Sequence, residues 1–360
     1  MSDWMNRALS RRQLLIGAAS AATLAVSPPT LARKMTPRRA LDLTKPADNV
    51  LAYLKMRAST VTQDVYFWFT GRLDQAVAGM PVKPFVNVES LILRRTEKLG
   101  DLQWNVIDWE ASYYRDAITA VVIEGEIENP HTGKMVRPIP YTEGPVRFRF
   151  TDQEPRIIGS RDVMPKTGKP FNYPWKIVDG DLWMTKSSYI KAPNWLDPAE
   201  WPLESSGKDL IVATQSTLRA KLADVENPAM ASVPTAFSYS ATSSWQPWMQ
   251  MGQTPGFLIW SEFGKKLFSL DQAPAEQVAT LRRFHPQWFG RPEPWPEFTN
   301  MYLQYKASHQ RAAPTTSERF EHAPVAGDPV RYAGAPQRIP VRDGVDRQHR
   351  LSEPAFGSGA

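Results

Sequence analysis

Apolar and polar residues alternate with a period of two over most of the chain, a pattern typical of β-strands with two different faces. In residues 236–245, Phe237, Tyr239 and Trp245 share one side, and four hydroxyl side chains share the other. Further runs of strand type cover residues 64–70, 85–93, 102–110, 117–127, 135–139, 147–150, 175–178, 181–184, 209–218 and 257–263. About ten antiparallel strands in one block predict a mainly β protein, built as a β-barrel or a curled sandwich.

Turn residues predict where neighbouring strands connect. Asp179-Gly180 lies between two apolar runs and strongly favours a two-residue hairpin turn. The turn-rich residues 129–134 predict a second hairpin, in which Glu128 would pair with Met135. Gly264-Lys265 predicts a third tight turn, after which the chain would return as a strand.

Helical signals are confined to three short segments, at residues 46–56, 274–284 and 300–306. Together with the strands they predict a single β-rich domain over residues 42–308, long enough to bury a sizeable core. Residues 309–360 are rich in Pro, Arg, Gly and Ser and have few large apolar side chains. We therefore expect a disordered C-terminal tail there.

Residues 1–32 predict an export signal. Ser10-Arg11-Arg12-Gln13-Leu14-Leu15 resembles a twin-arginine motif, and a short apolar stretch leads to a small residue, Ala32, for cleavage. This stretch is too short to span a membrane comfortably, so we expect no stable membrane span after cleavage. The expected partner during export is the twin-arginine translocase, and the expected location is the periplasm or another exported compartment. The alternatives are an ordinary basic N-terminus and a membrane anchor.

Composition excludes several kinds of chemistry. The chain has no cysteine, which rules out disulfides, a thiolate nucleophile and cysteine-bound iron–sulfur clusters. Its formal charge of +6 is small and scattered, so we expect no nucleic-acid partner. The five histidines lie far apart in the sequence, and no common metal, nucleotide or serine-hydrolase motif is present. We expect no metal site and no cofactor.

An ordered set of short motifs runs through the middle of the chain. It comprises Asn129-Pro130-His131-Thr132-Gly133, Glu143-Gly144-Pro145-Val146, Trp248-Met249-Gln250-Met251-Gly252, Gly256 and Gly264-Lys265-Lys266. In this order, the motifs resemble the landmarks of the family called domain of unknown function 1838. The resemblance covers roughly residues 42–306, and members of that family often carry twin-arginine signals. It implies no particular reaction, cofactor or catalytic residue.

Two carboxylates are candidates for proton transfer. Asp108 and Glu110 lie two residues apart in one predicted strand, on the same face as Trp104 and Val106. If this face lines the interior, loss of water would raise a carboxyl pKa toward the range useful for acid–base catalysis. Asp108, Glu110 and Tyr239 are therefore the predicted catalytic residues. The alternative is that the two carboxylates lie on a solvated outer face.

Large rings are the candidates for binding a flat apolar molecule. Trp195 and Trp201 lie in a proline-rich loop that is expected to fold over a pocket, and Trp245 and Trp248 lie beside turns, where rings are often half exposed. The predicted ligand-binding residues are Trp68, Trp109, Trp195, Trp201, Trp245, Trp248, Trp260, Asn129 and Arg149. The alternative for the tryptophans is that they fill the core.

Three classes of function follow from these signals. The first is an exported barrel protein whose aromatic-lined pocket binds an apolar or ring-containing small molecule. The second is a cofactor-independent isomerase, lyase or hydrolase that uses carboxylate acid–base chemistry. The third is a surface or assembly protein that uses exposed tryptophans against another chain.

Overall fold

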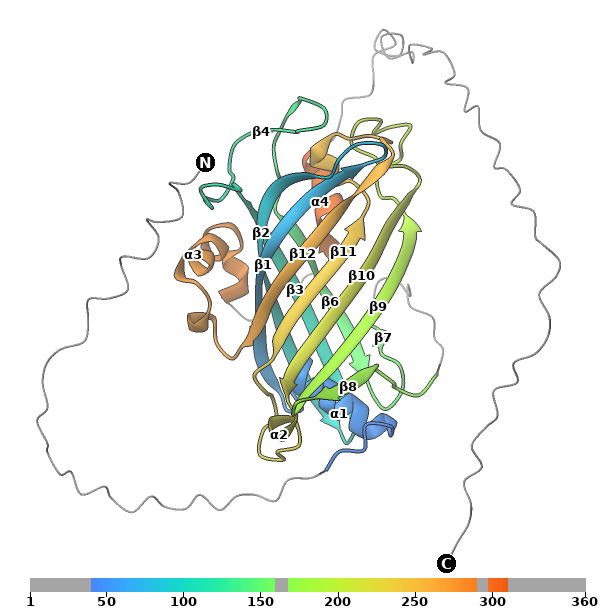
Figure 1. Ribbon diagram of the computed structural model, residues 1–360, viewed down its shortest axis with the longest axis vertical. Helices are drawn as coiled ribbons and strands as arrows, with labels where there is room; N and C mark the ends of the chain where they lie inside the picture. The colour runs from blue at the N-terminus through green and yellow to red at the C-terminus, as the bar shows by residue number, and fades with distance from the viewer. Residues whose placement is uncertain (1–39, 159–167, 290–296, 310–360) are drawn as a thin grey trace, which may run out of the picture. The chain divides into compact units, whose positions relative to one another are not determined.

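The computed structural model describes residues 40–158, 168–289 and 297–309 (Figure 1). The predicted signal peptide and the predicted tail from residue 310 onward lie outside these residues. The strands of the main sheet are β1 (Gln63–Val77), β2 (Lys83–Gly100), β3 (Gln103–Arg115), β6 (Tyr141–Phe150), β7 (Arg156–Ile157), β8 (Trp175–Val178), β9 (Asp181–Pro193), β10 (Asp209–Lys221), β11 (Ala236–Ser243), β12 (Gly256–Leu267) and β13 (Thr299–Asn300). A separate small hairpin consists of β4 (Ile127–Glu128) and β5 (Met135–Val136). The helices are α1 (Pro46–Arg57), α2 (Leu222–Val225), α3 (Ala275–Phe284) and α4 (Met301–Ser308), with short 3₁₀ turns η1 (Pro247–Met249), η2 (Leu270–Gln272) and η3 (Pro286–Phe289).

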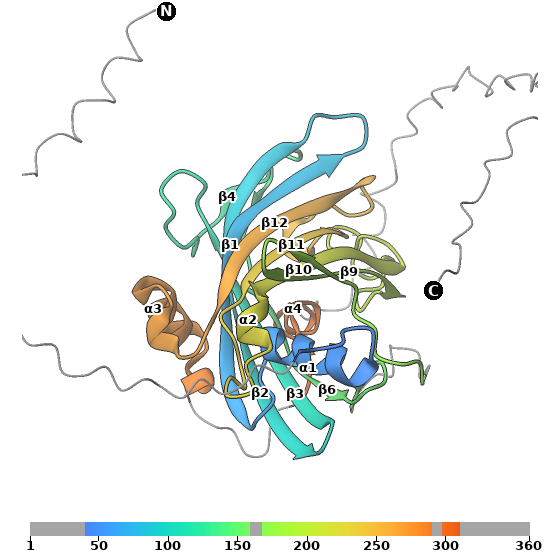
Figure 2. The same ribbon diagram turned by 60° about the horizontal axis from the view of Figure 1, so that its bottom comes forward.

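In the described part of the chain, eleven strands form one antiparallel sheet. Ten of them follow the order β13-β6-β3-β2-β1-β12-β11-β10-β9-β8, and β7 pairs with the side of β6. The sheet curls into a half-barrel, which confirms the predicted mainly β, antiparallel architecture. Figure 2 shows helices α1 and α4 within the curve of the sheet and helix α3 outside it.

Two of the predicted hairpins are confirmed. Val178 pairs with Asp181 across a two-residue turn in which Asp179 and Gly180 have φ angles of 50° and 76°, as this turn type requires. In the small hairpin, Glu128 pairs with Met135 in the predicted register. The three predicted helices are also present, as α1, α3 and α4.

The predicted turn at Gly264-Lys265 is wrong, because β12 continues through both residues. Gly264 pairs with Phe69 of β1, and a Cβ atom on Gly264 would lie 2.0 Å from the backbone oxygen of Trp68. The glycine therefore permits close contact between two strands and does not reverse the chain.

The predicted strand at residues 117–127 is also wrong, since only Ile127 belongs to a regular strand there. The side chain of Asp116 accepts hydrogen bonds from the backbone nitrogens of Ile118 and Thr119, and Ala120 has a φ angle of 59°. These local contacts stabilise a turn, which outweighs the strand propensity of the apolar residues.

Apolar clusters fill both ends of the concave face. At one end, Leu54 and Met56 of α1 pack against Phe67 of β1 and Trp104 of β3. At the other, Met301 and Tyr305 of α4 belong to a cluster with Leu73, Trp201, Trp245, Trp248 and Trp260. On the convex face, Leu281 of α3 packs over Leu91 and Trp109. The concave face between the two apolar ends is the part of the sheet that remains for polar chemistry.

Candidate functional site

Polar side chains from neighbouring strands meet in the middle of the concave face. The members of this group, which we call the acidic layer, are Ser90 of β2, Glu110 and Ser112 of β3, Tyr141 and Glu143 of β6, Tyr239 of β11 and Glu262 of β12. The strand register brings them together, because Ser90 pairs with Ser112, Glu110 with Glu143 and Tyr239 with Glu262. Three carboxyl groups that lie far apart in the sequence thus share one face.

An irregularity in the strand pairing places Glu143 in this layer, opposite Glu110. The register between β3 and β6 shifts between Asp108 and Glu110, so that Glu110 lies directly opposite Glu143. Gly144 allows the distortion, since its φ angle is 125° and a Cβ atom there would lie 2.7 Å from the backbone oxygen of Asp108. Bulges of this kind often redirect a side chain near a functional site.

Hydroxyl groups contact all three carboxyl groups of the acidic layer. Tyr141 donates its phenolic hydrogen to Glu143 Oε2 over 2.6 Å. Ser112 Oγ lies 3.3 Å from Glu110 Oε1, and Ser90 Oγ lies 3.1 Å from Glu262 Oε1. The two serine oxygens are 2.7 Å apart, so Glu110 and Glu262 are joined by a continuous series of contacts.

The carboxyl groups of the acidic layer favour their neutral forms. Burial raises the pKa of Glu110 to about 8, and the nearby Glu143 carboxylate adds to this rise. Burial is also the main cause that raises the pKa of Glu262 to about 8, and the negative charge of Glu110 adds to this rise. Burial also raises the pKa of Glu143. Near neutral pH, such groups can both donate and accept protons.

The phenols of the acidic layer stay protonated. Burial raises the pKa of Tyr141 and of Tyr239 above the usual range, and the neighbouring glutamates raise both further. Glu110, Glu143, Tyr141 and Tyr239 are only half buried, whereas Glu262 is 5% exposed. The first four residues therefore keep part of their surface accessible.

Asp108, the other predicted catalytic carboxylate, has a different environment from Glu110. It accepts hydrogen bonds from Arg57 and from Arg94, whose Nε atom lies 3.2 Å from Asp108 Oδ2. Arg94 is 4% exposed and stacks over the ring of Phe67. Asp108 thus has the contacts of a carboxylate that compensates two buried cations. A role for Asp108 in proton transfer stays a prediction.

Trp201, Trp245 and Trp248 are buried, with exposed fractions of 5%, 2% and 2%. Trp248 donates its ring N–H to Gln246 over 2.6 Å, and Trp245 donates its own to the backbone of Thr254 over 2.8 Å. The expected half-exposed rings are therefore wrong for these residues. Together with α4, they fill one end of the concave face.

Trp68 and Trp109 point away from the acidic layer, on the convex face. Trp68 donates to Glu89 over 2.7 Å, and the Trp109 ring packs against Trp288 at 5.4 Å. Both residues belong to the cluster covered by α3. A ligand on the concave face would not touch them.

Trp260 is the predicted tryptophan that borders the acidic layer. It alternates with Glu262 on the concave face of β12, and its ring centroid lies 6.0 Å from that of Tyr141. Trp195 lies apart from the layer, where it stacks on Tyr302 of α4 at 5.6 Å.

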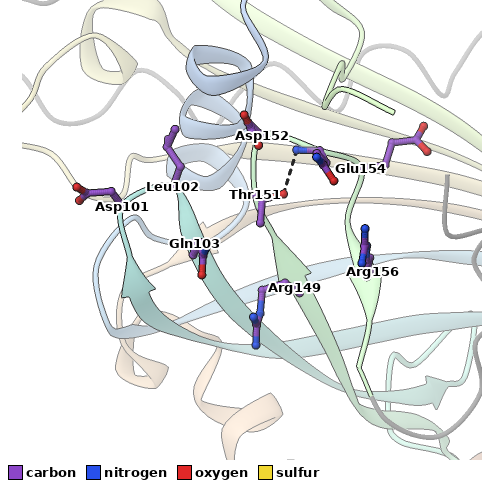
Figure 3. A pocket seen from close by; sticks show the side chains of 9 residues that line it. Asp101, Leu102, Gln103, Arg149, Thr151, Asp152, Glu154 and Arg156 are labelled. Carbon is purple, nitrogen blue, oxygen red and sulfur yellow. Dashed lines mark hydrogen bonds between the residues drawn. The ribbon is translucent and has the colours of Figure 1, made fainter. Parts of the chain in front are cut away.

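The remaining predicted residues, Asn129 and Arg149, also lie outside the acidic layer. Asn129 is fully buried and donates to the backbone oxygen of Met249 over 3.0 Å, which ties the small hairpin to η1. Arg149 donates to Asn105 over 2.7 Å and lines a polar cavity of about 430 Å³ beside Asp101 and Arg156 (Figure 3). The alternation along β6 places Arg149 on the opposite face from Phe148 and Phe150.

Sequence reasoning missed Glu143, Glu262, Tyr141, Ser90 and Ser112. Glu262 did carry a signal, because it follows the apolar positions Leu258 and Trp260 on one side of a predicted strand. An isolated carboxylate on an otherwise apolar strand face is costly unless it is solvated or functional. The serines carried no such signal, since small hydroxyl side chains occur on either face of a strand.

No helix in the described residues has the length and apolar character needed to cross a membrane. Across the same residues, no group of three or more His, Asp or Glu side chains is placed to hold a metal ion.

Fold and site together define a class of protein, an antiparallel half-barrel whose concave face carries carboxyl and phenol groups between two apolar ends. The chain belongs to the family described as protein of unknown function DUF1838, whose model matches residues 62–310. This match extends from the start of β1 to the end of α4 and confirms the resemblance found in the sequence motifs. No curated protein matches the chain.

Proposed function

We propose that this protein is an acid–base enzyme, an isomerase or a lyase, that acts on a small uncharged molecule held on the concave face. The observation that carries the proposal is the pairing of Glu110 with Glu143 on adjacent strands, both half buried. Burial raises the pKa of each carboxyl group. A site that only binds an apolar molecule gains nothing from placing several carboxyl groups where water is scarce.

The four accessible groups divide into complementary roles. Glu110, with a pKa of about 8, is a carboxylic acid at neutral pH and donates a proton. Glu143 already accepts a hydrogen bond from Tyr141, which favours its role as a base. The Tyr239 hydroxyl group is a donor for an oxygen atom that develops negative charge during the reaction.

Neighbouring rings indicate the substrate class. Trp260 borders Tyr141, and Phe237 stacks on Tyr239 with ring centroids 6.3 Å apart. Carboxyl groups repel anions, and their neutral forms donate hydrogen bonds to carbonyl or hydroxyl oxygens. We therefore propose an uncharged ring-containing substrate with at least one such oxygen.

Deuterium exchange tests this proposal. The purified full chain would be incubated in D₂O with a panel of cyclic ketones and unsaturated cyclic ketones, and deuterium uptake would be followed by mass spectrometry. We expect uptake into at least one compound and a loss of about 100-fold or more in Glu110→Gln and Glu143→Gln, since general acid–base catalysis contributes about 10²–10⁴-fold. Glu124→Gln is the matched control, because Glu124 forms an exposed ion pair with Arg283. Exchange rates that are the same in all four proteins would refute the acid–base assignment.

A binding protein is the second candidate. The half-barrel and its aromatic clusters are consistent with a binding fold, and Trp260 and Phe237 border the acidic layer from neighbouring strands. Native mass spectrometry separates the two candidates. A molecule that co-purifies unchanged, and that Glu110→Gln retains equally well, would favour binding without chemistry.

We also propose that the protein is exported by the twin-arginine pathway, on the basis of Arg11 and Arg12 in residues 1–32. Cell fractionation of the full chain tests this proposal. We expect the product in the exported fraction to lack about the first 32 residues. Substitution of both arginines by lysine is expected to retain the protein inside the cell, and unchanged export would refute the pathway.

A further inference from the structure

Glu110 and Glu262 are joined by three consecutive oxygen–oxygen contacts. They run from Glu110 to Ser112 over 3.3 Å, from Ser112 to Ser90 over 2.7 Å and from Ser90 to Glu262 over 3.1 Å. Ser90 and Ser112 are each 1% exposed, so water does not compete for their hydroxyl groups. Each of the three contacts therefore needs its own hydrogen atom from within the series.

The two serines cannot supply all three hydrogens. A serine hydroxyl group carries one hydrogen and can accept others through its lone pairs. Two hydroxyl hydrogens fill two contacts, and the third contact would place two oxygen atoms together without a hydrogen between them. Only the carboxyl groups at the ends, Glu110 and Glu262, have a titratable proton to offer. A single proton on either carboxyl group supplies the third hydrogen, so the series stays complete after the other carboxyl group has ionised.

We propose that Glu110 and Glu262 share a single proton, which Ser112 and Ser90 relay between the two carboxyl groups. When Glu110 holds the proton, it donates to Ser112, Ser112 donates to Ser90, and Ser90 donates to the Glu262 carboxylate. When Glu262 holds it, all three hydrogen bonds point the other way. The interconversion breaks three O–H bonds and forms three, and the net charge of the series does not change.

This inference rests on the proposed acid–base function of Glu110. Glu110 is half buried and faces the concave side, whereas Glu262 is 5% exposed. Glu110 is therefore the group that meets the substrate, and Ser90, Ser112 and Glu262 are positioning residues. When the shared proton is on Glu110, Glu110 can act as an acid, and when the proton is on Glu262, Glu110 can act as a base. The exchange between the two states needs no water molecule and no side-chain rotation.

Other charged or titratable groups also face the series. Glu143, Arg94 and Asp108 act on Glu110, and Tyr239 is close enough to Glu110 and Glu262 to feel the charge of both. Lys266, on the same face of β12 four residues beyond Glu262, donates instead to the backbone of Lys55 and to Ser232. None of these groups bridges the two carboxyl groups, so removal of a serine hydroxyl isolates the effect of the relay.

The test is an infrared pH titration of the full chain labelled with ¹³C at the glutamate carboxyl carbons. Glu110→Gln and Glu262→Gln assign the two bands. In the wild type, we expect two separate ionisation steps, with one proton retained between them. In Ser90→Ala the ratio of the two ionisation constants should fall about tenfold, the effect of one hydrogen bond. Ser90→Thr keeps the hydroxyl group and should restore the wild-type titration.

Ser188→Ala is the matched control, because Ser188 forms a hydroxyl–hydroxyl contact of 2.6 Å with Thr214 on the same face of the sheet. If Ser90→Ala does not fold, Ser112→Ala breaks the same series one position away and gives the same expected result. Identical titrations in Ser90→Ala or Ser112→Ala and the wild type would overturn the relay. The titration needs no substrate, so its outcome is independent of the deuterium-exchange assay. Unchanged titrations would overturn the relay alone, and a negative exchange assay would overturn the proposed function alone.

Discussion

Replacement of Glu110 by glutamine is expected to stabilise the fold at neutral and alkaline pH. The pKa of Glu110 rises from 4.5 to about 8 on folding, chiefly because burial disfavours the charged form. The folded protein thus binds this proton more tightly than the unfolded chain does. The contribution of Glu110 to stability is favourable below pH 4.5 and is lost progressively as the pH rises toward about 8.

The size of the effect follows from the two pKa values. Each pKa unit corresponds to about 1.36 kcal/mol, so a rise from 4.5 to about 8 corresponds to about 5 kcal/mol at alkaline pH. Glu110 keeps some accessible surface, and we therefore expect a smaller gain for Glu110→Gln, about 2–3 kcal/mol at pH 8. Glutamine has the same shape and can still accept the hydrogen bond from Ser112. The gain should disappear at pH 4, where the wild-type carboxyl group is neutral in both states.

Urea denaturation followed by tryptophan fluorescence at pH 4, 6 and 8 measures this difference. The denaturant slope should be the same for both proteins, so that the midpoints report stability directly. Glu124→Gln serves as the control and should change stability by less than about 1 kcal/mol, as is usual for an exposed ion pair. A Glu110→Gln variant that is less stable than the wild type at pH 8 would show that Glu110 is ionised in the folded protein, and the reasoning would fail.

Three other predictions concern the scaffold around the site. Asp108→Asn should lower the free energy of unfolding, measured by urea denaturation at pH 7, by about 3–5 kcal/mol, because it leaves the buried Arg94 without its carboxylate. A loss below about 1 kcal/mol would contradict this prediction. Gly264→Ala should cost more than about 2 kcal/mol, since its Cβ atom would meet the facing strand, whereas Gly100→Ala, with open space around it, should be nearly neutral in the same assay. Burial lowers the pKa of His285 to about 4, so the free energy of unfolding should fall as the pH drops from 6.5 to about 4. His285→Gln should reduce this loss by about 1–3 kcal/mol. An equal loss in the variant and the wild type would refute the prediction.

Local patterns were sufficient to predict most elements of the fold. The alternation of apolar and polar residues depends only on the geometry of a single strand, and a helix start or a two-residue hairpin depends on a few adjacent residues. The Asp179-Gly180 turn and the three helices are therefore where the sequence places them. Gly264 shows the limit, because the close contact it permits comes from a strand nearly 200 residues earlier in the chain.

The candidate site was only half predictable for the same reason. Alternation placed Glu110 on the same face as Trp104 and Val106, and the structure confirms that this face is concave. It gave no means of bringing Glu143 and Glu262 to Glu110, because those contacts depend on strand order and on the register shift between β3 and β6.

The sequence by itself determined the family, the antiparallel β architecture and two members of the site, Glu110 and Tyr239, since each of these is encoded in neighbouring residues. Tertiary structure alone decided which carboxyl groups meet and which tryptophans are buried. Curling the sheet brings β6, β3, β2, β1 and β12 around one concave face and seals its ends with α1 and α4. Burial there raises the pKa of Glu110, and no single strand could produce that environment.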